Sequence, residues 1–353
     1  MSPHDLLERF RALGVLRPLD LHLARAVGRM AGESDPLVLL GVAAASRVHG
    51  AGHICLELGA FRDQVRVEAL EGQEIPWPEA AAWEAALNQS PLVRGSGSDA
   101  RTPIVLEGHR LYLDRYWGYQ RRLVAQVEAR VGRATTEIGP EALEAALTRL
   151  FPPNPAIADE DLQRTSARTA AQRGFTIITG GPGTGKTTTI KRLMALLIGA
   201  AWDRGAPTPR FALMAPTGKA AARMKESIRA VETRVPLHAT DEVKAALPDE
   251  ASTIHRALGF NPRHRTQFKR NADNPLDADV IIVDEASMID LALMVKLFEA
   301  VRPEARLVLL GDADQLKSVE AGAVLGDLCR GLREGVVELT YTHRFGADSG
   351  VGA

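Results

Sequence analysis

The 353-residue chain has room for two or three domains, and 45% apolar residues are enough to build real cores. A net charge of −1 argues against a protein that is basic over its whole surface, so any groove for a nucleic acid must be local. No apolar run is long enough to span a bilayer, and residues 1–10 lack the apolar core of a signal peptide.

The front part of the chain is predicted to be a smaller, mostly helical domain. Apolar residues recur at helical spacing over Leu6–Leu16, and further helices are predicted over Leu21–Met30 and Leu37–Val48. The stretch Ile104–Leu113 is typical of a β-hairpin. No catalytic constellation is evident here, so we interpret the front part as a docking module or a scaffold.

The metal-binding side chains of the front part do not predict a metal site. His53 and Cys55 lie close together, but no second pair stands at ligand spacing, which favours a packed core pair. Cys55 and Cys329 lie far apart in the sequence, as is typical of reduced thiols in a cytoplasmic protein.

A helical connector over residues 118–156 follows the front part. Helical periodicity runs through Tyr119–Val131 and again through Pro140–Phe151. The stretch Phe151–Pro155 ends it, because each proline lacks an amide donor and restricts the residue before it. We therefore predict a domain boundary at these prolines.

A phosphate loop is predicted in the middle of the chain, where GGPGTGKT occupies residues 180–187 between an apolar strand and a helix. The glycines let backbone amides approach a triphosphate at the helix N-terminus. Lys186 is expected to neutralise the β and γ phosphates, and the hydroxyl of Thr187 to ligate Mg²⁺. The residues expected to bind ATP here are Gly180, Gly181, Pro182, Gly183, Thr184, Gly185, Lys186 and Thr187.

A second motif, Asp279–Ser287, places two acids after an unbroken apolar run. Such a run fits a parallel strand buried on both faces, and these sheets bind ligands at the carboxyl ends of their strands. Asp284 is expected to hold Mg²⁺, and Glu285 to orient and deprotonate the attacking water. The alternative is a strand end whose acids cap a helix.

The stretch Arg306–Gln315, like the second motif, is an apolar run followed by acidic and polar residues. Gln315 lies just beyond the carboxyl end of the predicted strand, within reach of the γ-phosphate; the alternative is an ordinary solvated loop glutamine. Together the three motifs predict an α/β fold with a RecA-like P-loop NTPase domain built on a parallel sheet.

Two further turns offer groups that suit a nucleic-acid backbone. Ala215–Lys219 follows another predicted strand, and Ser252–Leu258 has a similar set of hydroxyl, amide and cationic groups. Such groups bind phosphodiesters and do not read base edges. The loop Arg263–Arg270 adds cations near one aromatic residue, although a charged loop of this kind is more often a solvated surface excursion.

The ordered set of motifs resembles the superfamily 1 DNA helicases, and within them the RecD family, the alpha subunits of exodeoxyribonuclease V (RecBCD). The motifs are GGPGTGKTTT, APTGKAAARM, STIHRALG, VIIVDEASMID, LVLLGDADQLKSVEAGAVLGD and THRF. The resemblance extends into the front part through Gly52–Cys55 and Gly108–Leu113, so it covers most of the chain. Stand-alone RecD-type helicases carry a longer front region with helix-hairpin-helix elements, which favours the complex-bound subunit here.

The resemblance implies further site residues. Gln163 matches the glutamine that reads adenine. Arg344 matches the arginine that approaches the γ-phosphate from the second motor domain, where it stabilises charge on the transferred phosphoryl group. Four residues fall in segments that contact single-stranded DNA in the family: Pro216, Thr217, Thr253 and His255.

The resemblance also implies partners and a direction of movement. The family moves 5′ to 3′ on the 5′-ended single strand of a duplex end, in a heterotrimer with RecB and RecC. This complex acts in double-strand break repair and homologous recombination. The front part is then the face that docks onto RecC, and the cofactors are ATP and Mg²⁺.

The expected domains are residues 1–117 for docking, 118–156 for the connector, 157–340 for the first motor lobe and 341–353 for the start of a second lobe. Because the family continues with a whole second lobe, the chain is expected to be a piece that does not unwind DNA alone. Two functions stay open. One is an ATP-dependent DNA helicase subunit, and the other is a non-catalytic assembly module that binds nucleotide and RecC without unwinding.

Overall fold

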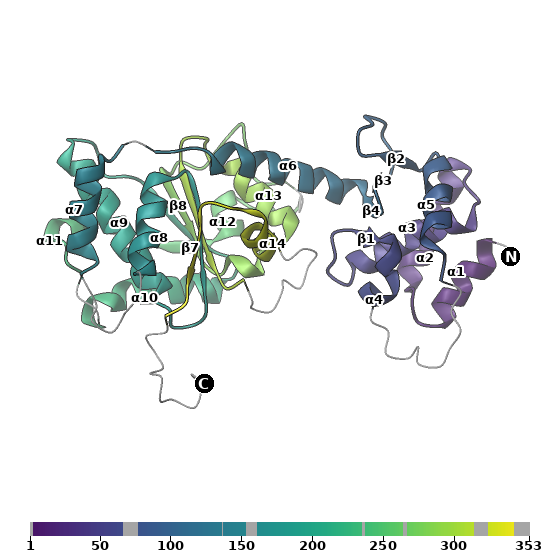
Figure 1. Ribbon diagram of the computed structural model, residues 1–353, viewed down its shortest axis with the longest axis horizontal. Coiled ribbons are helices and arrows are strands. Elements are labelled where there is room, and N and C mark those ends of the chain that lie inside the picture. The colour runs from purple at the N-terminus through teal and green to yellow at the C-terminus, as the bar shows by residue number, and fades with distance from the viewer. Residues whose placement is uncertain are drawn as a thin grey trace, which may run out of the picture. The chain divides into compact units, whose positions relative to one another are not determined.

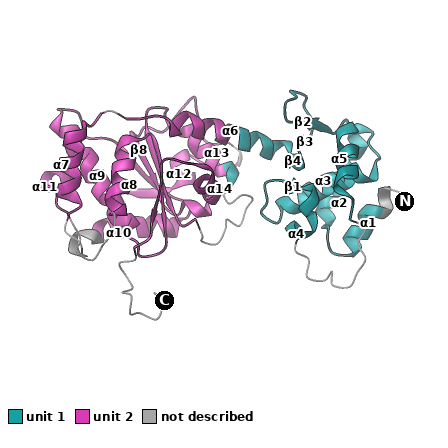
Figure 2. Cartoon of the chain, in the orientation of Figure 1, with its two compact units in different colours: residues 1–122, 290–292, 318–322 teal, residues 123–289, 293–317, 323–353 magenta. Residues whose placement is uncertain are grey.

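The structure, a computed structural model, describes residues 3–65, 77–135, 137–152, 161–234, 237–263, 267–313 and 324–341. The chain forms two compact units, one of residues 1–122 with 290–292 and 318–322, and one of the remaining residues (Figure 2). Along the chain, helix α6 (Asp114–Val131) passes from the first unit into the second. Within the described ranges, no helix combines the length and the apolar character needed to cross a lipid bilayer.

The first unit combines helices with a small sheet (Figure 1). Its helices are α1 (Pro3–Ala12), α2 (Pro18–Ala31), α3 (Pro36–His49), α4 (Phe61–Val65) and α5 (Ala80–Gln89). Its strands, in the order β1-β4-β3-β2, are β1 (Leu56–Glu57), β2 (Val93–Gly95), β3 (Ile104–Glu107) and β4 (Arg110–Leu113). Because β3 and β4 pair antiparallel, the hairpin predicted over Ile104–Leu113 is confirmed.

Helix α3 lies at the centre of the first unit. The side chain of Asp35 caps its N-terminus by accepting hydrogen bonds from the amides of Leu37 and Val38. Its apolar residues share one core with Phe10 of α1 and Trp83 of α5, which are both fully buried. A helix that is apolar nearly all round, as this one is, belongs in the interior of a domain.

A buried charge connects α2 to α3. The Asp20 carboxylate is fully buried and accepts hydrogen bonds from Arg17 Nη2 at 2.8 Å and from the Ser46 hydroxyl at 2.7 Å. Burial acts to raise the pKa of Asp20, but the hydrogen bonds from Arg17 and Ser46 outweigh it and hold that pKa below its ordinary value. Asp20 thus pairs with Arg17 at the start of α2, and the hydrogen bond from Ser46 links this pair to α3.

The second unit is built on a six-stranded parallel sheet with helices packed against it (Figure 1). In the order β10-β5-β9-β8-β6-β7, its strands are β10 (Val336–Leu339), β5 (Phe175–Gly180), β9 (Arg306–Gly311), β8 (Val280–Val283), β6 (Phe211–Ala215) and β7 (Ala251–Thr253). Besides the end of α6, its helices are α7 (Pro140–Leu150), α8 (Leu162–Gln172), α9 (Lys186–Asp203), α10 (Gly218–Arg234), α11 (Asp241–Ala245), α12 (Ile254–Leu258), α13 (Leu291–Ala300) and α14 (Val324–Gly331).

Helices cover both faces of this sheet, which is why β5, β8 and β9 are buried along their whole length. On one face Ile178 and Val308 share a core with α7, α8 and α9. On the other face the ring of Phe175 packs edge-on against that of Phe298 in α13, with centroids 5.3 Å apart.

The parallel register brings the carboxyl ends of β5, β9, β8 and β6 to the same edge of the sheet. The predicted fold class is thereby confirmed: an α/β domain with a parallel sheet, preceded by a smaller, mostly helical part. That edge is where the three predicted motifs meet.

Candidate nucleotide-binding site

The turn between β5 and α9 has the backbone that its glycines predict. Gly183 and Gly185 have φ angles of +87° and +91°, which residues with a side chain rarely adopt. Gly185 is the N-cap of α9, so the free amides of the first helical turn begin at Lys186. A Cβ on Gly180 would lie 2.7 Å from the carbonyl oxygen of Leu339, so the close approach of β10 requires glycine there.

The side chain of Lys186 lies over this turn. Its Nζ donates a hydrogen bond to the carbonyl oxygen of Gly181 at 3.0 Å and another to that of Gly180. The hydroxyl of Thr184 closes the same turn by donating to Gly181 at 2.9 Å. The ammonium group is thus already beside the amides that would receive a phosphate.

Gln163 lies against the phosphate loop. Asp161 begins α8 by accepting hydrogen bonds from the amides of Gln163 and Arg164 at 3.0 and 3.2 Å. Gln163 is buried, and its Nε2 donates to the carbonyl oxygen of Thr184 at 3.2 Å. The structure therefore brings Gln163 to the loop, and its role in reading adenine stays a prediction.

Asp284 and Glu285 follow β8 at the same sheet edge. The amide of Asp284 donates to the carbonyl oxygen of Met214 in β6 at 2.9 Å, and the amide of Glu285 donates to Oδ1 of Asp284 at 2.9 Å. Glu285 has a φ of +53°, and no other non-glycine residue in the described ranges has a positive φ. Such strained backbone persists where its surroundings impose it, and it is concentrated at functional sites.

Both of these carboxyl groups have raised pKa values. Burial raises the pKa of Asp284, and the amide of Glu285 and the charge of Lys186 offset this only in part. Burial also raises the pKa of Glu285, and the charge of Asp284 adds to the effect while Lys186 and Arg223 oppose it. The lysine of the first motif and the acids of the second therefore act on one another within one site.

Two charged residues of this site were not singled out from the sequence. Arg223 of α10 lowers the pKa of Glu285, and Asp312, directly after β9, raises it. Asp312 follows a buried strand just as Asp284 does, and that shared pattern could have identified it. Arg223 lies in a helix with an ordinary mixture of small and basic residues, so no spacing pointed to it.

Thr187 and Asp284 have the chemistry to hold Mg²⁺. Thr187 lies in the first turn of α9, next to Lys186. Asp284 is a largely buried carboxylate, and no arginine or lysine of the described residues forms an ion pair with it. Carboxylate and hydroxyl oxygens, together with phosphate and water, are the ligands that Mg²⁺ prefers. These two residues therefore fit a magnesium ion bound with a triphosphate.

Gln315 and Arg344 lie outside the described residues, so their places beside the γ-phosphate stay predictions. The described chain after β9 reaches Ala313, whose amide donates to the hydroxyl of Thr179 at 3.0 Å. This bond joins the end of the third motif to the end of β5, where the phosphate loop begins.

The residues predicted to contact DNA lie at the carboxyl ends of β6 and β7, which pair in parallel. Pro216 and Thr217 directly follow β6, and Thr253 is the last residue of β7. The hydroxyl of Thr217 accepts a hydrogen bond from the amide of Ala220 at 3.2 Å, and that of Thr253 accepts one from the amide of Arg256 at 3.2 Å. Both hydroxyls thus cap helices, and contact with DNA stays a prediction.

His255 belongs to a small aromatic cluster. Its ring is exposed, and its centroid lies 5.2 Å from that of Phe260 and 5.8 Å from that of Phe268. Phe260 and Phe268 also face one another as an isolated antiparallel bridge, so the three rings close the loop after α12. The histidine therefore has a packing role besides the predicted contact with DNA.

Two family models match the sequence. One, described as the N-terminal domain of RecBCD enzyme subunit RecD, matches residues 12–112, and an AAA domain matches residues 163–321. RecBCD enzyme subunit RecD of Mycolicibacterium smegmatis is 43% identical over 98% of this chain and 58% of its own length. RecBCD enzyme subunit RecD of Haemophilus influenzae is 34% identical over 78% of this chain and 46% of its own length.

A helicase is also among the similar proteins. The ATP-dependent RecD2 DNA helicase of Deinococcus radiodurans is 39% identical over 48% of this chain and 19% of its own length. The chain spans about half the length of the RecD relatives that it matches. The RecD N-terminal model covers most of the hairpin of the first unit. The AAA model begins at Gln163 and covers the phosphate loop and the acids after β8. The chain therefore belongs to the RecD family, with the RecD N-terminal domain followed by an AAA domain.

Proposed function

We propose that this chain is the ATP-hydrolysing part of a 5′-to-3′ DNA helicase subunit of the RecBCD complex, exodeoxyribonuclease V. The observation that carries the proposal is the meeting of Lys186 with Asp284 and Glu285 at one edge of the parallel sheet, where the charge of Lys186 opposes the rise that burial causes in the pKa of both carboxyl groups. Family membership supports DNA unwinding as the process that ATP hydrolysis drives, because the relatives are named RecBCD subunits and an ATP-dependent DNA helicase.

The chemistry follows from the charges at this edge. Lys186 exchanges the carbonyl oxygens of the loop for the β and γ phosphates, and Gln163 reads the adenine. Thr187 and Asp284 would hold a Mg²⁺ ion, which would neutralise phosphate charge when bound. Glu285 takes a proton from the attacking water, and a raised pKa makes its carboxylate a stronger base for that step.

Two residues outside the described ranges complete the proposed reaction. Gln315 contacts the γ-phosphate, and Arg344 stabilises the charge that develops on the transferred phosphoryl group. Arg344 acts from the start of a second motor lobe, residues 341–353. The first lobe, residues 157–340, binds the nucleotide and the 5′-ended single strand of a duplex end.

The contacts to DNA and to partner proteins lie on separate parts of the chain. Pro216, Thr217, Thr253 and His255 are proposed to face the single strand. Residues 1–117 dock onto RecC and residues 118–156 connect them to the motor, so that the chain joins RecB and RecC in a cytoplasmic heterotrimer. The proposed process is double-strand break repair and homologous recombination.

The test is ATP turnover by the wild-type chain and by Lys186→Ala, with and without single-stranded DNA. Lys186→Ala is expected to abolish turnover without changing the circular dichroism spectrum. Lys244→Ala, which removes a lysine from the short helix α11, is the matched control and should leave turnover unchanged. Near-wild-type turnover by Lys186→Ala would refute the site. Nucleotide binding without turnover under all conditions would favour a non-catalytic assembly module.

A further inference from the structure

The end of α6 and the turn after it, residues 130–135, contact elements of the second unit at the pole opposite the nucleotide site. The amide of Thr135 donates to the carbonyl oxygen of Gln172, the last residue of α8, at 2.8 Å. The amide of Gly174, just before β5, donates to the carbonyl oxygen of Arg133 at 3.0 Å. A Cβ on Gly174 would lie 2.6 Å from Nε of Arg133, so this segment is also closely packed.

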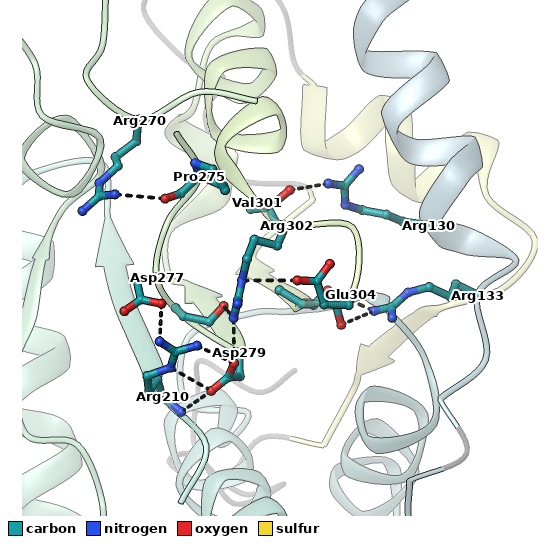
Figure 3. Close-up of polar contacts among 12 residues, drawn as sticks. Arg130, Arg133, Arg210, Arg270, Pro275, Asp277, Asp279, Val301, Arg302 and Glu304 are labelled. Carbon is teal, nitrogen blue, oxygen red and sulfur yellow. Dashed lines mark hydrogen bonds and ion pairs between the residues drawn. The ribbon is translucent and has the colours of Figure 1, made fainter. Parts of the chain in front are cut away.

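Arg130, in the last turn of α6, is a buried cation with 4% of its surface exposed. Its Nη2 donates to the carbonyl oxygen of Val301 at 2.8 Å (Figure 3). The same nitrogen donates to the carbonyl oxygen of Phe298 at 3.3 Å, also at the C-terminal end of α13. Its Nη1 bonds to Gln126 of its own helix. No carboxylate of the described residues forms an ion pair with it, so the carbonyl groups at the end of α13 compensate the charge.

A second arginine and two aromatic rings extend this contact. Nη2 of Arg133 donates to the carbonyl oxygens of residues 304–305, just before β9, at 2.8 and 3.0 Å (Figure 3). The guanidinium of Arg130 lies 5.7 Å from the centroid of Phe298, and that ring packs on the ring of Phe175, the first residue of β5. Both rings are fully buried, so α6, α13 and β5 are in continuous contact.

The four elements that this segment contacts carry the nucleotide site at their opposite ends. Gln163 is near the start of α8, Gly180 ends β5, Glu285 lies shortly before α13, and Asp312 directly follows β9. These elements are short: α8 has 11 residues, or about 16 Å, and β5 has 6 residues, or about 20 Å. A displacement at one end reaches the other, because closely packed elements move as rigid bodies.

We propose that Arg130 is a positioning residue for ATP hydrolysis, because it holds the end of α13 against α6 and β5 and so keeps Glu285 aligned with the phosphate loop. The inference rests on the proposed function and deepens it by naming a way to regulate the same site. Helix α6 is the segment through which the chain passes from the first unit into the second. A force applied to α6 is therefore transmitted through Arg130 and α13 to Glu285, the residue proposed to activate the attacking water.

A neighbouring arginine provides a matched control. Arg210 pairs with Asp277 and Asp279 at the same pole of the sheet, and its side chain is 49% exposed (Figure 3). Exposed ion pairs of this kind contribute little to stability. Arg210→Met therefore removes an arginine side chain and its ion pairs without changing a contact of α6.

The experiment compares Arg130→Met, Arg130→Lys and Arg210→Met with the wild-type 353-residue chain. It measures the dissociation constant of Mg-ATP, turnover per active site and the midpoint of thermal unfolding. Arg130→Met is expected to lower turnover per active site by about 2- to 30-fold while the dissociation constant stays within about twofold. Arg130→Lys keeps the charge and one donor group and is expected to restore most of the rate. Arg210→Met is expected to match the wild type.

A merely structural role for Arg130 gives a different result. Arg130→Met then lowers the unfolding midpoint and the fraction of active sites but leaves turnover per active site unchanged, which overturns the inference. If Arg130→Met does not fold, Phe298→Leu, which removes the ring under the guanidinium, takes its place with the same expected separation of turnover from binding.

The inference can also be separated from the proposed function. If the wild-type chain shows no turnover, the proposed function fails, and amide hydrogen exchange without nucleotide decides the inference. Arg130→Met, and not Arg210→Met, is then expected to speed exchange at residues 284–289. Unchanged exchange there refutes the positioning role.

Discussion

Replacing Glu285 by glutamine is expected to preserve nucleotide binding and to remove hydrolysis. The amide has nearly the size of the carboxylate, and the backbone cost of a φ of +53° is the same for the two residues. Lys186, Thr187 and Asp284 keep their groups for the phosphates and Mg²⁺. The amide, however, cannot accept a proton from the attacking water.

The size of the effect follows from the role of a positioned base. Such a base contributes about 10²- to 10⁴-fold to the rate, or about 3–5 kcal/mol of transition-state stabilisation. The upper part of this range is expected, because Glu285 is half-buried and the charges of Asp284 and Arg223 act on it, so bulk water is a poor substitute there. Removing one negative charge beside the phosphates should leave affinity unchanged or slightly improve it.

The assay is a pair of measurements on the wild-type chain and Glu285→Gln: Mg-ATP affinity by equilibrium binding, and single-turnover hydrolysis over a range of pH. Only the carboxylate form of Glu285 acts as a base. Because burial and Asp284 raise its pKa, the wild-type rate should fall with decreasing pH sooner than an ordinary glutamate would allow. That acid limb should be absent from the residual rate of the variant. Loss of affinity together with turnover would instead make Glu285 a binding residue and refute the reasoning.

Two further predictions concern stability. Asp20→Asn should lower the free energy of unfolding in urea by about 2 kcal/mol, because the buried carboxylate loses its charge-assisted hydrogen bonds from Arg17 and Ser46. The wild-type advantage should be lost as pH falls through the lowered pKa of Asp20 and be absent from the variant. Gly180→Ala should lower the midpoint of thermal unfolding and abolish ATP binding, because the added Cβ would lie 2.7 Å from the carbonyl oxygen of Leu339. Gly181→Ala is the control and should unfold like the wild type, because a Cβ there enters open space. Equal midpoints for the two variants would contradict the steric argument.

Local patterns predicted which groups meet at this edge of the sheet, because these groups lie next to the strands that position them. The turn that ends in Lys186 and the acids after β8 follow short, strongly apolar strands, and a parallel sheet brings such strand ends together. Arg223 and Arg130 escaped prediction because their partners are far away in the sequence. Arg130 bonds to carbonyl oxygens about 170 residues later, and no periodicity in α6 indicates that contact.

The start of α6 shows the same limit on a smaller scale. Periodicity predicted a helix from Tyr119, whereas the helix begins at Asp114, directly after β4. Its first turns carry the aromatic residues Tyr116 and Trp117, which pack within the first unit and do not form a regular polar and apolar alternation. A helix boundary that is set by packing against a sheet is not visible in the helix's own sequence.

The strand order relates the nucleotide to the predicted DNA contacts along one edge. With about 4.8 Å between neighbouring strands, β8 lies about 10 Å from β5, with β9 between them, and β6 and β7 follow beyond β8. Helix α10 starts directly after Pro216 and Thr217 and carries Arg223, whose charge lowers the pKa of Glu285. A movement of the turn before α10 therefore changes the distance between Arg223 and Glu285, and with it the basicity of the carboxylate. Under the proposed function, a strand bound at Pro216 and Thr217 would therefore have an electrostatic effect on the attacking water, besides any mechanical effect through the sheet.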